Sequence, residues 1–253
     1  MSAYGPLAGV YDALTGDVEY GRRADYIQRL FQKSRIPVHT VLDLACGTGT
    51  IACLLAERGY RVTAVDGSPD MLAQAAEKAR GLENPPLFLC QPMQRLHLAE
   101  MADGAVSTLD SLNYLTRERD LRETLRRVCR WLRPGGRFVF DVNTPYKLRR
   151  MDRQLYMDET EESFCVWRTF FSERTGICTY QVDLFRRRPD GAWTRSMEEH
   201  REKAWTREQL TAFLEDAGFS GVRFSGDLTR RPPAEDEDRW IVVCDKPADG
   251  PEK

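Results

Sequence analysis

Short apolar runs alternate with amphipathic stretches through the first half of the chain. The apolar runs have the length of buried strands and lie at residues 41–44, 61–65, 87–90, 105–109 and 137–142. Apolar residues at helical spacing follow three of them, at residues 51–55, 71–79 and 121–132. This alternation predicts an α/β, doubly wound, mostly parallel sheet that helices cover on both faces.

The pattern changes after Pro145. Three runs of alternating character, at residues 164–171, 178–185 and 193–205, are separated by turn residues at 174–176 and 189–191. They predict an antiparallel β insert. On its third run Ser196, Glu198, His200 and Glu202 share one face, which either lines a substrate cavity or lies open to water.

The core pattern resumes at Thr206, where Thr206 and Gln209 form a capping-box signature for a helix that Gly218 ends. Two strands at residues 221–225 and 240–244 then follow each other without a helix between them, which predicts an antiparallel hairpin at the edge of a seven-stranded sheet. We therefore divide the chain into an N-terminal lid and helix (1–35), a core (36–144 and 206–247) and the insert (145–205).

Composition narrows the function classes. The chain has 253 residues and a net charge of −2, so no global basic field recruits nucleic acid. No apolar run is long enough to span a bilayer, and the start lacks the pattern of a signal peptide. Seven scattered cysteines without a CxxC pair argue against a disulfide framework and a zinc site. We expect a cytoplasmic protein without a metal, either a monomer or a homodimer.

Candidate chemistry centres on the stretch from Val41 to Thr50, which reads as strand, glycine turn and helix. This arrangement brings backbone N–H groups and a helix N-terminus up to a ligand. Asp43, Asp66, Gln91 and Asp110 end or follow successive strands, so they gather at one sheet edge. Residues 47–52 match G-x-G-x-x-A, and Asp66 suits a ribose; both a nicotinamide or flavin site and an S-adenosylmethionine site fit.

Several motifs together resemble the class I S-adenosylmethionine-dependent methyltransferases. They are Val41-Leu-Asp-Leu-Ala-Cys-Gly-Thr-Gly49, Val65-Asp-Gly-Ser68 with Met71, Asp110-Ser-Leu-Asn-Tyr114, Leu132-Arg-Pro-Gly-Gly136 and Ala217-Gly-Phe219. The likeness extends over roughly the whole chain. It is greatest to small bacterial methyltransferases with a β insert, some of them related to sugar N-methyltransferases, and it implies the Rossmann-like methyltransferase fold.

The resemblance also implies a set of cofactor-binding residues. Asp43, Ala45 and Gly47 would hold the methionine end of S-adenosylmethionine, and Asp66 the ribose hydroxyls. Gly67 and Met71 would lie against the adenine, which the backbone from Gln91 to Met93 would meet at its edge. Asp110 would lie near the amino group or the sulfonium, and Tyr11 and Tyr20 look like lid positions. Relatives often carry an acid at the position of Pro92, so we expect altered adenine recognition here.

Three residues are candidates for contact with the acceptor. His200 is the candidate base because its unperturbed pKa lies near neutrality, although a structural histidine is the more common case. Asn113 and Tyr114 follow the fourth strand and either touch the acceptor or only shape the wall.

We therefore expect a methyltransferase acting on a small polar or amine acceptor. The alternatives are an RNA (tRNA) methyltransferase, motivated by the arginines of 119–133 and 186–188, a NAD-dependent oxidoreductase, and a protein that only binds the cofactor.

Overall fold

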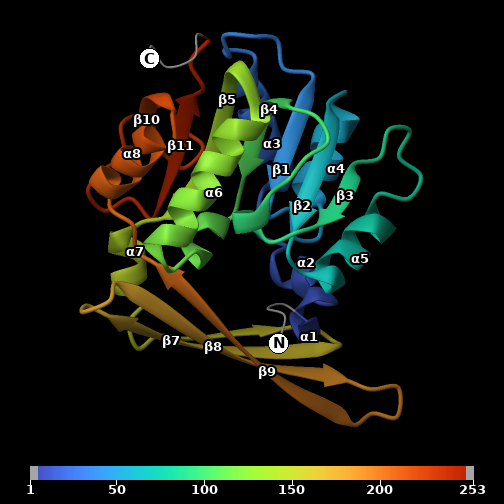
Figure 1. Cartoon of the computed structure of the whole chain (residues 1–253). Helices are drawn as coiled ribbons and strands as arrows, with labels where there is room; N and C mark the ends of the chain where they lie inside the picture. The colour runs from blue at the N-terminus through green and yellow to red at the C-terminus, as the bar shows by residue number, and fades with distance from the viewer. Residues whose placement is uncertain (1–4, 249–253) are drawn as a thin grey trace.

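The computed structural model describes residues 5–248, in which seven strands form one sheet in the order β10-β11-β5-β4-β1-β2-β3 (Figure 1). Their bounds are β1 Thr40–Leu44, β2 Arg61–Asp66, β3 Leu87–Cys90, β4 Ala102–Ser107, β5 Leu132–Asn143, β10 Ser220–Gly226 and β11 Arg239–Asp245. β11 runs antiparallel to its neighbours β5 and β10, and the other pairings are parallel. The predicted fold class and the edge hairpin are confirmed.

Helices cover both faces of this sheet, as the alternating pattern predicts. The helices are α1 Gly5–Ala8, α2 Tyr11–Leu14, α3 Tyr20–Phe31, α4 Thr50–Glu57, α5 Pro69–Lys78, α6 Glu118–Trp131, α7 Pro145–Arg150 and α8 Arg207–Asp216, with the short 3₁₀ helices η1 Met93–Arg95 and η2 Ser111–Tyr114. Buried residues of α6 and α8 pack on Leu42, Phe138 and Phe140, whereas those of α3 and α4 pack on Val41 and Val139. The sheet therefore lies between two apolar layers.

A second sheet, of the order β6-β7-β8-β9, lies beyond the carboxyl ends of the parallel strands (Figure 1). Its antiparallel strands are β6 Leu155–Glu159, β7 Ser163–Ser172, β8 Ile177–Arg187 and β9 Trp193–Lys203. Helix α1 and the 3₁₀ helix η2 both contact β9, so the N-terminal segment lies between the sheets. The predicted division of the chain into core and insert stays a prediction.

Three strands differ from the sequence-based expectation. β4 covers Ala102–Ser107 instead of residues 105–109. β5 begins at Leu132 instead of residue 137, because the pairing with β4 shifts between Ala102 and Gly104 and Gly135 takes a φ of +82°. β6 went unpredicted: all five of its residues are exposed, so the strand shows no alternation of buried and exposed positions. Within residues 5–248 there is no helix of the length and hydropathy that a bilayer span requires.

Gly104 packs closely against Phe31 of α3 and leaves no room for a side chain. A Cβ added there would lie 2.8 Å from one ring carbon of Phe31 and 3.1 Å from Val38. We expect Gly104→Ala to lower the free energy of unfolding by about 1–3 kcal/mol through overpacking. Urea unfolding of the purified variant measures this.

The control is Gly21→Ala in α3, where nothing lies within 4 Å of an added Cβ. This change should be neutral or stabilise by up to about 1 kcal/mol, because alanine favours the helix. A Gly104→Ala protein as stable as the Gly21→Ala protein would contradict the packing described here.

Candidate active site

The backbone of the glycine turn after β1 takes left-handed conformations that residues other than glycine rarely adopt. Ala45, Gly47 and Gly49 have φ angles of 59°, 53° and 73°, and α4 begins at Thr50. A Cβ on Gly49 would lie 2.8 Å from that of Ala75 in α5, so glycine is needed for conformation and for close packing. The turn consequently brings its backbone and the N-terminus of α4 to the carboxyl edge of the sheet.

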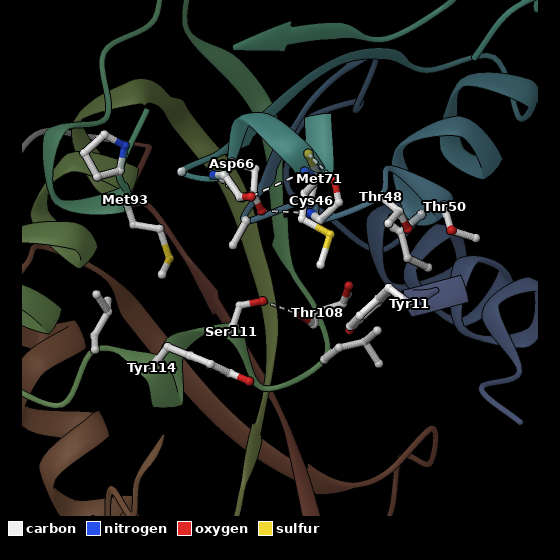
Figure 2. Close-up of a pocket in the computed structure, with 18 of the residues that line it drawn as sticks. Tyr11, Cys46, Thr48, Thr50, Asp66, Met71, Met93, Thr108, Ser111 and Tyr114 are labelled. Carbon is white, nitrogen blue, oxygen red and sulfur yellow. Dashed lines mark hydrogen bonds between the residues drawn. The ribbon is translucent and has the colours of Figure 1, made fainter. Parts of the chain in front are cut away.

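A cavity of about 450 Å³ opens at this edge (Figure 2). The glycine turn, the ends of β2 and β3, the turn after β4 and the N-terminal segment all contribute to its wall. Figure 2 shows Tyr11 and Tyr114 approaching one end of the cavity, with Ser111 and Thr108 between them. The lining residues are Tyr11, Tyr20, Ala45, Cys46, Gly47, Thr48, Thr50, Ile51, Asp66, Gly67, Ser68, Met71, Pro92, Met93, Gln94, Thr108, Leu109, Ser111, Tyr114 and Leu115.

Asp66, the last residue of β2, presents a fixed carboxylate to the cavity. Its Oδ2 accepts the Gly47 N–H at 2.9 Å and its Oδ1 accepts the Ser68 N–H at 2.8 Å. Burial raises the pKa of this carboxyl above its ordinary value, although these backbone hydrogen bonds oppose the shift. Each oxygen retains a lone pair, so Asp66 can accept two further hydrogen bonds from a ligand with neighbouring hydroxyls.

Asp43 lies behind the glycine turn with an exposed fraction of 1%. Across residues 5–248, neither of its carboxylate oxygens has a hydrogen-bond partner. Burial and the nearby charge of Asp66 raise its pKa to about 7. An ionised, buried carboxylate without hydrogen-bond donors lowers the stability of the ligand-free protein. A cationic ligand group beside it would stabilise it.

The turn after β4 forms part of the cavity wall, and its conformation depends on Asp141, a residue that sequence reasoning missed. Leu109 and Asp110 take φ angles of 55° and 54°, a left-handed conformation that is strained for both. Asp141 of β5 holds them, because its carboxylate accepts the Leu109 N–H at 3.0 Å and the Asp110 N–H at 2.7 Å. Burial raises the pKa of Asp141, but the guanidinium groups of Arg239 and Arg23 outweigh that effect and lower it.

The N-terminal segment is tied to the rest of the site by Asp12. Its Oδ1 accepts the Thr48 hydroxyl at 2.6 Å, and its Oδ2 lies 2.6 Å from Nζ of Lys78. Tyr11, the preceding residue, lines the cavity, and its pKa is raised by burial and by Tyr20. The segment therefore covers one end of the cavity through a charge-assisted contact.

Nine of the residues that the sequence proposed line the cavity together: Tyr11, Tyr20, Ala45, Gly47, Asp66, Gly67, Met71, Met93 and Tyr114. Among the residues that sequence reasoning missed, Thr48, Thr50 and Ser68 adjoin proposed positions on the same turns, so the motifs already located them. Gln94 likewise adjoins the proposed Met93. Thr108 had no such signal, because the pattern predicts a strand that continues to residue 109.

Five proposed residues lie outside the lining. Asp43 lies beneath the glycine turn, the Gln91 side chain bonds to the backbone of His97, and Asp110 pairs with Arg239 at 2.6 Å. Asn113 donates to the carbonyls of Asn143 at 3.0 Å and Lys203 at 2.9 Å, which joins η2 to both sheets. The ring of His200 lies behind Tyr114, with 6.0 Å between ring centroids.

The described residues contain no group of three or more His, Cys, Asp and Glu side chains arranged to hold a metal ion.

Comparison with known proteins identifies the family. Residues 41–136 match the family model described as a methyltransferase domain. A protein of Geobacillus sp. (strain WCH70) named "Putative methyltransferase" is 31% identical over 96% of this chain and 99% of its own length.

Solved structures show the same fold. An S-adenosylmethionine-dependent methyltransferase from Clostridium acetobutylicum superimposes with a TM-score of 0.86 at 26% identity, over 96% of this chain and 99% of that one. A sugar N-methyltransferase from Streptoalloteichus sp. gives a TM-score of 0.78 at 20% identity, over 94% and 93%. The chain belongs to the class I S-adenosylmethionine-dependent methyltransferases, and it is an enzyme that uses S-adenosylmethionine.

Proposed function

We propose that this methyltransferase acts on an amine of a small polar molecule, which binds at the end of the cavity between Tyr11 and Tyr114. One observation carries the proposal. Tyrosine and hydroxyl side chains form this end of the cavity, and the described lining residues include no lysine or arginine. Such a wall suits a neutral or cationic polar group, whereas an anionic acceptor would need a cationic partner.

The residues around the glycine turn fit the cofactor. We assign the ammonium group of its methionine end to Asp43, whose buried carboxylate oxygens lack hydrogen bonds in the described structure. We assign the ribose hydroxyls to Asp66, whose oxygens keep free lone pairs after binding two backbone N–H groups. Ala45 and Gly47 would contribute backbone groups of the turn between these two carboxylates.

The adenine would lie between Gly67 and Met71 on one side and Met93 on the other, since all three line the cavity. Pro92 also lines it, but proline offers neither a side-chain acceptor nor a backbone N–H. Gln94 is the lining residue close to Pro92 in sequence that carries an amide, so we assign recognition of the adenine edge to Gln94 together with the Met93 N–H. Gln91 contributes through its backbone, because its side chain is engaged by His97.

Bound S-adenosylmethionine supplies a methyl group that its sulfonium makes electrophilic. The protein therefore has to orient the acceptor and exclude water, and orientation of this kind can lower a barrier by about 7–11 kcal/mol. Tyr114 and Tyr11 would orient the amine, because both line this end of the cavity. Asp110 and Asn113 would support the wall, and His200 would act on the acceptor through Tyr114, since its ring lies behind that residue.

An RNA acceptor has weaker support, because acids pair with many of the arginines that motivated it. Arg122 bonds to Glu118 at 2.7 Å, Arg127 to Glu123 at 2.6 Å and Arg133 to Asp103 at 3.1 Å. Paired arginines bind phosphates less strongly. The sugar N-methyltransferase with the same fold acts, by its name, on an amine, and that likeness shows the fold alone.

Because the pKa of Asp43 is raised, the affinity for a cationic ligand should increase as the pH rises. Below about pH 7 its carboxyl is protonated in the free protein, and a cationic ligand must displace that proton. We expect the affinity for S-adenosylhomocysteine to rise about tenfold from pH 6 to pH 8, because the binding-competent fraction rises by that factor. Isothermal titration in buffers of different ionisation enthalpy measures the affinity and the released proton.

Asp43→Asn is the control for titration of the ligand itself, since the asparagine variant cannot ionise at this position. Its affinity should be lower and should lack the rise between pH 6 and pH 8 that the wild-type protein shows. Parallel pH profiles for the two proteins would contradict the role of Asp43.

Asp66→Asn tests the ribose contact. The variant loses the negative charge that strengthens hydrogen bonds from both hydroxyls, so the dissociation constant for S-adenosylhomocysteine should increase on the order of 100-fold. The matched control is Asp70→Asn, an exposed residue of α5 outside the cavity lining, which should bind like the wild type. Equal affinities of the wild type, Asp66→Asn and Asp70→Asn for S-adenosylhomocysteine would contradict the proposed ribose contact.

The acceptor is tested by incubating the enzyme with labelled S-adenosylmethionine and a panel of amino sugars, amino acids, simple alcohols and bulk tRNA. We expect label in an amine, lost on N-acetylation of that amine, and a product mass increased by one methyl group. Label in tRNA that disappears with added salt would instead favour the RNA alternative.

A further inference from the structure

One face of β9 carries a buried carboxylate and a buried imidazole next to an apolar cluster. Glu198 and His200 point to the same side, with side-chain exposures of 9% and 1%. Their cross-strand neighbours on β8 are Val182 and Tyr180, which belong to the apolar cluster between the second sheet and the N-terminal segment. A carboxylate in such surroundings is stable only when its oxygens have well-placed partners.

Glu198 contacts the N-terminal segment with one oxygen and His200 with the other. Its Oε1 accepts the backbone N–H of Leu7 at 2.9 Å. Its Oε2 lies 3.0 Å from Nε2 of His200, a close polar contact without the geometry of a hydrogen bond. Leu7 is 1% exposed and belongs to the same apolar cluster. One carboxylate thus connects the N-terminal segment, which also carries Tyr11, with an imidazole of the second sheet.

His200 in turn contacts the cavity wall. Its ring packs edge-on against Tyr114, with centroids 6.0 Å apart and planes at 76°, and lies 6.4 Å from the ring of Trp167. Tyr114 lines the cavity at the end assigned to the acceptor. The contacts therefore run from the Leu7 N–H through Glu198 and His200 to a residue of the site.

We propose that Glu198 is a positioning residue that couples closure of the N-terminal segment to the orientation of His200 and Tyr114. When Leu7 is seated, one oxygen of Glu198 holds its N–H. The other oxygen favours the His200 tautomer with the proton on Nε2, because a lone pair on that atom would face the carboxylate at 3.0 Å. When the segment leaves, the carboxylate loses the Leu7 N–H and can turn away from the imidazole, which removes this preference. The importance of this coupling for an acceptor rests on the function proposed above.

Two substitutions separate the two contacts. Glu198→Gln keeps an amide oxygen for the Leu7 N–H but replaces the acceptor facing His200 with a donor. Glu198→Leu keeps a similar volume and removes both acceptors. The matched control is Glu199→Gln, the next residue of β9, which is exposed on the opposite face.

The first readout is the tautomer of His200 from ¹⁵N chemical shifts. The chain has three histidines, and His200→Gln assigns the signal. The wild-type and Glu199→Gln proteins should show the Nε2-protonated form, and Glu198→Gln a mixture or the other tautomer. A mixture in the wild type, or the same tautomer in Glu198→Gln as in the wild type, would overturn the proposal.

The second readout is amide hydrogen exchange of the peptide covering residues 5–14. Exchange should be about tenfold faster in Glu198→Leu, where the Leu7 N–H loses its acceptor, and close to wild type in Glu198→Gln. Unchanged exchange in a folded Glu198→Leu protein would overturn the coupling. If Glu198→Leu does not fold, the tautomer comparison between the wild type and Glu198→Gln decides.

Neither readout uses the cofactor, so the two proposals can fail separately. A wild-type protein that does not bind S-adenosylhomocysteine would overturn the proposed site and leave the tautomer and exchange results standing. Normal S-adenosylhomocysteine binding with a mixed His200 tautomer in the wild type would overturn the role of Glu198 alone.

Discussion

The carboxylate of Asp141 fixes the part of the molecule on which the site depends. It sits on the buried strand β5 and binds the N–H groups of Leu109 and Asp110, the two residues that leave β4 in a left-handed conformation. That conformation costs about 1–2 kcal/mol for each non-glycine residue, so the turn needs an external hold. The wall formed by Thr108, Leu109 and Ser111 exists in this shape because Asp141 supplies that hold.

The carboxylate of Asp141 also binds arginines from α3, near the N-terminus, and from β11, near the C-terminus, at the carboxyl edge of the sheet. Arg23 of α3 lies 3.3 Å from Asp141 and also binds Asp227 at 3.1 Å, while Arg239 of β11 pairs with Asp141 and with Asp110. Removing one member of such a buried network leaves an uncompensated charge, which typically costs about 3–5 kcal/mol. The N-terminal helix and the edge hairpin are therefore coupled to the cavity wall through charge as well as through apolar packing.

Sequence reasoning located those parts of the site that local signals specify. The glycines of the turn and Asp66 were predicted because a strand, a turn and a helix adjoin them in sequence, and the structure places Gly47 and Asp66 on one cavity. Asp110 was expected beside the cofactor, but Arg239 pairs with it from 129 positions away, and no local pattern records that partner. His200 shares one face of β9 with Glu198, as the alternation predicts, whereas the ring that packs against it, Tyr114, belongs to η2. Whether these residues act as proposed stays a prediction.

The carboxyl groups of Asp43 and Asp66 lie near the same edge of the sheet but differ in their hydrogen bonds. The two residues end neighbouring strands of a parallel pair, so their charges interact, and burial raises the pKa of both carboxyl groups. Backbone N–H groups compensate Asp66, but within residues 5–248 no hydrogen-bond donor meets the oxygens of Asp43. A folded protein gains nothing from an ionised carboxylate in that position, and an uncharged residue of similar size would be more stable there. The acid is consistent with a ligand that brings positive charge to the turn, and S-adenosylmethionine carries such charge on both its sulfonium and its ammonium group.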